Sequence, residues 1–240
     1  MPQMFFHMTQ IAVVTPECAD IAKWQEWAHS DSEITPTHQA PDYSVIAPSV
    51  RRRLSVMGRC ALTAYASLTP EKTEPTIWAS SWGDISRTFK LTQSLAESSD
   101  MSPAEFALSV HNAIGAQAAI WLQNHTATTA IAAGELTASS AFIEAYLKLQ
   151  HCPSVILVRY EDVLPALWNH NNENDASPLT CAWAIRLSAQ KSNSSFTLKP
   201  CNPFGSSLNH NILSEIRFLL GGISSYEEND GQRGWHWEWT

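Results

Sequence analysis

The sequence predicts an α/β domain in which helices pack against a mixed or parallel β-sheet. Short β-prone runs alternate with segments of helical periodicity along most of the chain. The run at 154–161 (SVILVRYE) is rich in β-branched residues, as is typical of a buried strand. With 240 residues, 44% of them hydrophobic, the chain can bury one large core. No repeat or low-complexity linker divides it, so we expect residues 1–240 to form a single domain.

The β-prone runs and the helical periodicity assign most of the chain to elements. We expect strands at 5–14, 76–82, 127–134, 154–161, 181–190 and 194–200. We expect helices at 16–29, 51–68, 89–97, 102–123, 135–150 and 211–224. Ser49 is a candidate N-cap for the second helix, and Ser102 with Pro103 and Glu105 forms a capping pattern for the fourth. The polar stretch 169–178 predicts a loop, and the Trp-rich tail 234–240 is expected to dock on its own domain.

Composition and motif content exclude several classes of function. The net charge of −8 argues against general nucleic-acid binding. No apolar stretch approaches the roughly 20 residues of a membrane span, and the N-terminus lacks a signal-peptide pattern, so we expect a cytoplasmic protein. The five cysteines are scattered without a CxxC pair, which predicts reduced, mostly structural thiols. No nucleotide-binding, zinc-protease or serine-hydrolase motif occurs, so we expect no cofactor and no metal.

The charged residues leave two interpretations open. Only 16% of the residues are charged, which fits either a face covered by a partner or a surface rich in Ser, Thr and Asn. The one basic run is Arg51-Arg52-Arg53. It is either a solvated helix start or a docking point for an acidic partner protein.

The segment with the clearest chemical implication is 129–135, where a small-residue strand runs into a helix. α/β enzymes place nucleophiles at such turns because a helix N-terminus stabilises negative charge. Here the turn carries Glu135, whose carboxylate is a poor acyl-transfer nucleophile. The simpler interpretation is a capping glutamate. His111, inside the predicted apolar helix, is expected to be a core or interface residue.

Five segments between residues 50 and 167 carry a family resemblance: RRRLSVMGRCAL, IWASSWGDISRT, SPAEFALSVHNAIGAQAAIW, TAIAAGELTASSAFIEA and SVILVRYEDVLPA. Each is weak alone, but in this order they resemble the N-terminal half of the β-ketoacyl synthases. The resemblance is strongest to the shortened chain-length factors of aryl polyene gene clusters. It implies a thiolase-like layered (αβα) fold, a single truncated half of a ketoacyl synthase, with a divergent C-terminal tail.

The resemblance also implies a lost active site. In active synthases, a helix containing an Asn precedes a strand that ends at the nucleophilic cysteine. Placing Asn112 on that Asn carries Glu135, without a gap, onto the cysteine position. The second half of a synthase, which brings two active-site histidines, has no counterpart. The resemblance therefore implies a non-catalytic pseudo-enzyme that forms a heterodimer with an active β-ketoacyl-ACP synthase and serves as its chain-length factor.

The same resemblance implies where the partner lies. The strand 127–134 corresponds to one that pairs with its twin across the dimer axis, where small side chains permit close approach. Phe106 lies near a position whose bulk limits the length of the acyl chain. The expected acyl tunnel and partner interface comprise Phe106, Leu108, Ser109, His111, Asn112, Thr128, Thr129, Ile131 and Glu135. Arg51, Arg52 and Arg53 would then be a docking point for acyl carrier protein.

Two alternatives remain at this stage. Glu135 could serve as a decarboxylating or general-base residue in an enzyme that acts alone. The chain could also be a structural scaffold of a biosynthetic complex, with no role in an acyl tunnel.

Overall fold

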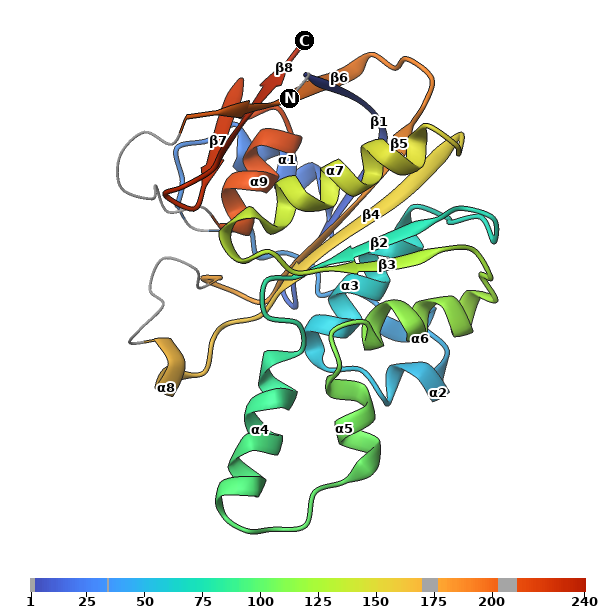
Figure 1. Cartoon of the computed structure of the whole chain (residues 1–240), viewed down its shortest axis with the longest axis vertical. Helices are drawn as coiled ribbons and strands as arrows, with labels where there is room; N and C mark the ends of the chain where they lie inside the picture. Colours follow the sequence, from blue (N-terminus) through green and yellow to red (C-terminus); the bar gives the residue numbers. More distant parts are fainter. Residues whose placement is uncertain (1–2, 34, 170–176, 203–210) are drawn as a thin grey trace.

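A mixed β-sheet runs through the centre of the computed structural model, which describes residues 3–33, 35–169, 177–202 and 211–240 (Figure 1). Within these residues eight strands pair in the order β3-β2-β4-β5-β1-β6-β8-β7. The strands are β1 (Met4–Val14), β2 (Thr76–Ala79), β3 (Thr128–Ile131), β4 (Ser154–Glu161), β5 (Cys181–Ser188), β6 (Ser194–Cys201), β7 (Ser225–Asn229) and β8 (Gly234–Trp239). β2 is parallel to β3 and β4, and the other pairs are antiparallel. The predicted mixed sheet is confirmed.

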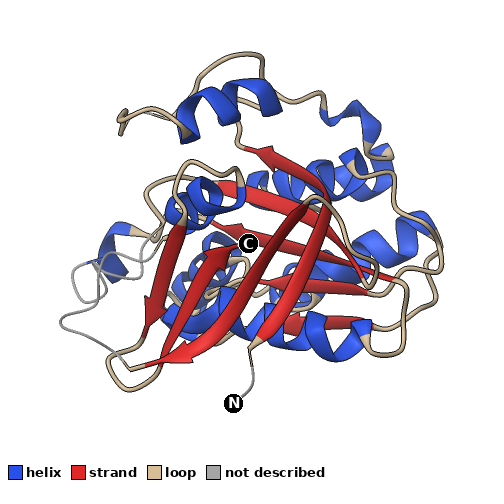
Figure 2. Ribbon diagram, turned by 90° about the horizontal axis from the view of Figure 1, so that it is seen from above, coloured by secondary structure: helices blue, strands red, loops and turns tan. Residues whose placement is uncertain are grey.

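Helices cover both faces of this sheet, as Figure 2 shows from above. The helices are α1 (Ile21–Ala28), η1 (Tyr43–Val45), α2 (Pro48–Arg51), α3 (Val56–Ser67), α4 (Ile85–Ala96), α5 (Pro103–Ser109), α6 (Ala113–Leu122), η2 (Gly134–Leu136), α7 (Thr137–Leu149), α8 (Ala166–Asn169) and α9 (Ile212–Leu219). One apolar core lies between the sheet and α1, α7 and α9. The other lies between the sheet and α3 and α6. The predicted layered αβα arrangement is therefore confirmed.

Two helices that the sequence predicted as continuous are each broken in the structure. The predicted helix 51–68 is α3 preceded by the short α2, and its N-cap is Ser55, which accepts the Gly58 N–H at 3.2 Å; the expectation for Ser49 was wrong. The predicted helix 102–123 is α5 and α6, separated at an extended Val110. That break coincides with a tertiary hydrogen bond of the neighbouring His111 ring, which local sequence patterns do not encode. The predicted loop 169–178 lies mostly outside the described residues.

The Trp-rich tail packs on its own domain, as expected. It forms β8, between β6 and β7, which the sequence did not predict as a strand. The Trp237 ring is fully buried and lies edge-on to Phe142, at a centroid distance of 4.8 Å. It is also edge-on to Phe218 at 5.6 Å. Aromatic pairs of this geometry stabilise beyond the area they bury.

The helices α4 and α5 form a hairpin that projects away from the sheet (Figure 1). We call residues 85–109 the arm. Of its described helical residues, only Ile85 is buried in α4 and none is buried in α5. The arm therefore has almost no core of its own.

Helix α6 lies so close to β2 that it requires a glycine at position 115. A Cβ atom added to Gly115 would lie 2.7 Å from Cδ1 and 2.8 Å from Cγ of the fully buried Trp78 ring. The ring is also held by a 3.1 Å hydrogen bond from its Nε1 to the Thr76 hydroxyl. Close packing of α6 on the sheet thus depends on a missing side chain.

We predict that Gly115→Ala destabilises the protein, measured as a loss in the free energy of unfolding by chemical denaturation. Helix propensity alone would make this change stabilising by about 1 kcal/mol. The clash with Trp78 should outweigh that gain and give a net loss of roughly 1–3 kcal/mol, as for other overpacked cores. A neutral or stabilising effect would show that α6 does not approach β2 this closely.

Candidate functional site

The turn between β3 and α7 lies where the sequence placed it, and it carries Glu135. β3 ends at Ile131, η2 spans Gly134–Leu136, and α7 begins at Thr137. Leu136, not Glu135, occupies the N-cap position of α7, and Glu135 lies one residue earlier, in the first turn of η2. The five cysteines are at positions 18, 60, 152, 181 and 201, away from this turn in the sequence.

Glu135 borders a small polar cavity. The volume is about 20 Å³, enough for roughly one water molecule. Its described lining residues are Ser81, Gly134, Glu135, Arg159, Glu161, Ser177, Asn211, Ile212, Glu215 and Glu228. Neither a cysteine nor a histidine is among them. The polar groups of the site are thus carboxylates, hydroxyls, one amide and one guanidinium.

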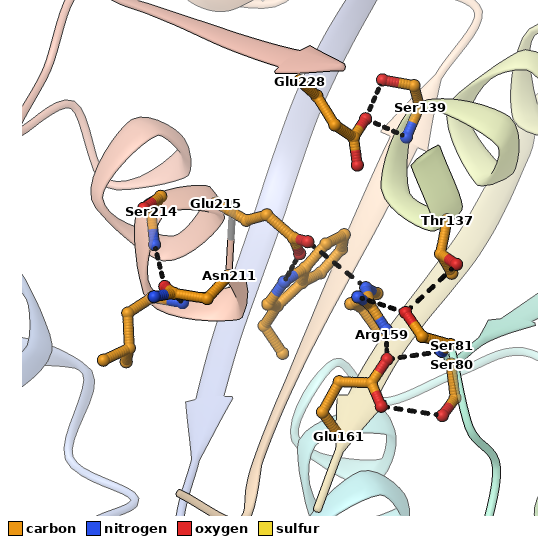
Figure 3. A network of polar contacts seen from close by, with 12 residues as sticks. Ser80, Ser81, Thr137, Ser139, Arg159, Glu161, Asn211, Ser214, Glu215 and Glu228 are labelled. Atoms are coloured by element: carbon orange, nitrogen blue, oxygen red, sulfur yellow. Dashed lines mark hydrogen bonds and ion pairs between the residues drawn. The ribbon is translucent and has the colours of Figure 1, made fainter. Parts of the chain in front are cut away.

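Arg159, near the end of β4, lies at the centre of this cluster (Figure 3). Its guanidinium forms an ion pair with Glu161, two residues along the same strand, and a second with Glu215 of α9 at 3.4 Å. All three side chains are at most 6% exposed. Burial lowers the pKa of Arg159, but the charges of Glu161 and Glu215 outweigh that effect and hold it above its ordinary value. The guanidinium therefore remains charged.

Glu215 and Glu228 make further hydrogen bonds, which connect the cluster to β5, to α7 and to the Trp-rich tail. Glu215 accepts the Trp183 indole N–H at 2.8 Å. Glu228 of β7 accepts the Ser139 backbone N–H at 2.9 Å and also its hydroxyl, and Ser139 in turn accepts the Trp237 indole N–H at 3.1 Å. Burial, and then the charge of Glu215, raise the pKa of Glu228 to about 8, against the opposing effect of the Ser139 bonds. At neutral pH Glu228 is mostly protonated.

We predict that Glu228→Gln becomes more stable relative to the native chain as the pH rises. Between its ordinary pKa of 4.5 and the folded value of about 8, native Glu228 holds a proton that the unfolded chain has released. Stability therefore falls with rising pH across that window, by about 1 kcal/mol per unit at most, and levels off above it. Glutamine does not titrate. Denaturation of both proteins from pH 5 to 9 gives the difference curve, and a flat difference would contradict the raised pKa.

Glu161 links the cluster to the turn that follows β2. One carboxylate oxygen accepts the Ser81 backbone N–H at 2.5 Å, and the other accepts the Ser80 hydroxyl at 3.2 Å. The Ser81 hydroxyl donates to the Gly134 carbonyl at 3.0 Å, which ties this turn to η2. A single buried carboxylate thus fixes the start of the segment that leads into the arm.

Arg159, Glu161, Glu215 and Glu228 were not predicted from the sequence. One sequence pattern could have indicated a buried ion pair in this strand. Two charged residues spaced i and i+2 lie within the apolar run 154–161, and this spacing places both on one face of a strand predicted to be buried. Apart from each other, their partners lie more than 50 positions away along the chain, at Ser80, Ser81 and Glu215, and no local pattern links these residues to β4.

The predicted tunnel residues lie on α5, on the junction between α5 and α6, on β3 and on η2. Phe106 is 59% exposed on α5. Leu108, Ser109, His111, Thr129 and Ile131 are half-buried, and Asn112 and Thr128 are exposed. His111 Nε2 lies 2.8 Å from the Ser80 carbonyl oxygen, so it joins the α5–α6 junction to the turn after β2. Glu135 faces the polar cavity instead, so the predicted set is divided between two environments.

The basic run does not start a helix, so that expectation was wrong. Arg51 ends α2 and Arg52 is its C-cap. Arg51 is half-buried and donates to the Tyr43 carbonyl at 3.0 Å, whereas Arg52 and Arg53 are exposed. Two guanidinium groups of the run are therefore available at the surface.

The described residues contain neither a cluster suited to a metal ion nor a helix suited to a membrane. Among residues 3–33, 35–169, 177–202 and 211–240, no group of three or more His, Cys, Asp or Glu side chains is placed to hold a metal ion. No helix in the same residues has the length and apolarity needed to cross a membrane.

Comparison with known proteins places the chain in a family. The sequence model described as "Beta-ketoacyl synthase, N-terminal domain" matches residues 24–238, so the match extends well into the tail. None of the curated proteins compared with the chain matches it. The structure is similar to that of the ketosynthase ApeO in complex with its chain length factor ApeC from Xenorhabdus doucetiae. The TM-score is 0.83 at 18% identity, over 98% of this chain and 99% of that chain.

Two more distant structures have the same fold. The ishigamide ketosynthase/chain length factor gives a TM-score of 0.62 at 12% identity, over 83% of this chain and 67% of that one. A β-ketoacyl synthase from Burkholderia phymatum STM815 gives 0.59 at 9% identity, over 93% and 71%. These likenesses confirm the predicted thiolase-like ketosynthase fold. The chain belongs to the family of β-ketoacyl synthase N-terminal domains.

Proposed function

We propose that this chain is a non-catalytic chain-length factor that forms a heterodimer with an active β-ketoacyl-ACP synthase. The observation that carries the proposal is Glu135, at the strand-to-helix turn where the family resemblance places the nucleophilic cysteine. A thiolate accepts an acyl group readily, and a carboxylate in its place does not. Condensation would then depend on the cysteine of the partner.

The cavity beside Glu135 argues against the decarboxylase alternative. Its volume of about 20 Å³ is far below the several hundred Å³ of a typical substrate pocket. The space is occupied by the buried side chains of Arg159, Glu161, Glu215 and Glu228. An acyl substrate would have to displace paired charges, which is costly in a buried site.

The edge of the sheet supports a protein partner. β3 is the last strand on its side of the described sheet, and neither it nor α6 contains a charged residue or a proline. Natural edge strands usually carry such residues, which prevent uncontrolled pairing. Ile120 on α6, next to β3, is 67% exposed, and Val110 at the start of the α5–α6 junction is also exposed. An apolar, unprotected edge of this kind favours a covering partner. In the similar complex from X. doucetiae, a ketosynthase is bound to its chain length factor.

Phe106 is our candidate for the residue that limits acyl-chain length. It exposes an aromatic ring on α5, which has no buried residues among those described and is thus available to a partner. With Leu108, His111 and Asn112 it would shape a tunnel shared with the synthase. The exposed Arg52 and Arg53 would offer a weak docking point for the acidic acyl carrier protein.

We predict that a ketosynthase is encoded beside this chain and that the chain, carrying the only tag, co-purifies with it in a stoichiometric complex. The eluate should catalyse condensation, and replacing the nucleophilic cysteine of the partner should abolish it. This chain alone should neither condense acyl groups nor release carbon dioxide from malonyl-carrier protein. Elution of the chain by itself, or elongation without the partner's cysteine, would refute the heterodimer.

We predict that Phe106→Ala lengthens the acyl product of that complex, because truncating a side chain at the end of a pocket deepens it. The measurement is the product distribution by mass spectrometry. Leu95→Ala is a matched control, since Leu95 is equally exposed on the other helix of the arm, at 65%. If both variants give the native product, the scaffold alternative is supported and Phe106 has no tunnel role.

A further inference from the structure

The arm is held in position by its two attachment points and a few polar contacts rather than by buried packing. Of the described residues in its helices, only Ile85 is buried. A hairpin with so little buried area has few packing contacts of its own to hold it at a fixed angle to the sheet. The chain enters the arm through residues 80–84 and leaves it through residues 110–112.

Both attachment points meet at Ser80. On the entry side, the Ser80 hydroxyl accepts the Gly83 backbone N–H at 2.8 Å. On the exit side, the His111 ring lies 2.8 Å from the Ser80 carbonyl oxygen. The two segments also touch directly, because a Cβ atom on Gly83 would lie 3.2 Å from Cδ2 of His111, and Gly83 has a positive φ of 64°. Ser80, 0% exposed, is therefore the buried junction of the arm.

The end of β4 holds this junction in place. Glu161 accepts hydrogen bonds from the Ser80 hydroxyl and the Ser81 backbone N–H. The neighbouring Tyr160 hydroxyl donates to the His111 carbonyl at 3.4 Å. Glu161 is in turn held by its ion pair with Arg159. A continuous set of contacts thus leads from the buried cluster through Ser80 to the helix that carries Phe106.

Other contacts hold the arm together without reaching the cluster. Arg87 of α4 pairs with Asp84 at 3.3 Å and with Glu105 of α5, and it donates to the Arg53 carbonyl at 2.9 Å. These bonds join the two helices to each other and to the end of α2. Because the Arg87–Glu105 pair joins α4 to α5, a displacement of either helix at the Ser80 junction would also affect the helix that carries Phe106.

We infer that Glu161 is a positioning residue that sets the placement of the arm, and through it the length of the acyl chain. Only the link to acyl-chain length rests on the proposed function. In this view the carboxylates that fill the former reaction site have a role: they hold the segment that would line the partner's tunnel. The anchoring itself is a property of this chain alone.

Two variants test the inference, with one matched control. Glu161→Gln leaves one acceptor oxygen for three donors, and Ser80→Ala removes the hydroxyl between Glu161 and Gly83 without touching the cluster charges. Glu74→Gln is the control. Glu74 is equally buried, at 5% exposure, and paired with Arg186 at 2.7 Å, but it precedes β2 and makes no contact with the arm that the structure records. Any general effect of neutralising a buried, paired carboxylate should appear in this control.

The first readout is hydrogen exchange of the full chain. Amides of residues 85–109 should exchange about tenfold faster or more in Glu161→Gln and Ser80→Ala than in the native protein, and not in Glu74→Gln. The second readout is the acyl product of the complex with the synthase, which should broaden or lengthen in the same two variants. Complex formation should persist in both.

The outcomes separate the inference from the proposed function. Native-like exchange in the arm of Ser80→Ala would overturn the anchoring, even where Glu161→Gln does not fold. Faster exchange with an unchanged product, in a complex where Phe106→Ala does change it, would overturn the link to chain length. If no complex forms, the proposed function fails, and hydrogen exchange still decides the anchoring.

Discussion

Arg159 carries a full positive charge into the interior of the protein, and an interior tolerates such a charge only when acceptors surround it. Glu161 and Glu215 provide that compensation from β4 and α9. Removing one partner of a buried pair typically costs roughly 3–5 kcal/mol, because the remaining charge is left unpaired. The sheet, α9 and the turn after β2 are therefore bound to one another through a single guanidinium. A change in the relative placement of these elements would separate the buried Arg159 guanidinium from its carboxylates.

Under the proposed function, the same cluster would allow a synthase-like fold to lose its reaction site and remain well packed. Where an active site needs open space beside the nucleophile, this chain has side chains in contact. Glu228 adds a carboxyl group that is mostly protonated at neutral pH, so it adds little negative charge to the cluster. Ser139 and Trp237 then connect it to α7 and the tail. The space beside Glu135 is thus filled by side chains whose contacts join β4 to α9 and β7 to α7.

The elements that sequence reasoning predicted well are those determined locally. β4 spans 154–161 as its β-branched run predicts, and α7 follows its amphipathic pattern. The mixed sheet and the position of Glu135 followed from the same reasoning. The break at Val110–Asn112 was not predicted from the sequence, because it coincides with a bond between His111 and Ser80, which are 31 residues apart. The charge cluster was not predicted for the same reason. Arg159 and Glu215 are 56 positions apart, and only folding brings them together.

The central place of β1 in the sheet has a consequence for how the chain folds. β1 pairs with β5 and β6, so that Met8, for example, lies opposite Leu187 and Ser194. Residues 4–14 therefore remain unpaired until a segment almost the length of the domain away is present. Contacts of such long range slow folding and leave apolar strands exposed in the meantime. During synthesis, this protein must keep its first strand from aggregating while most of the chain is still being made.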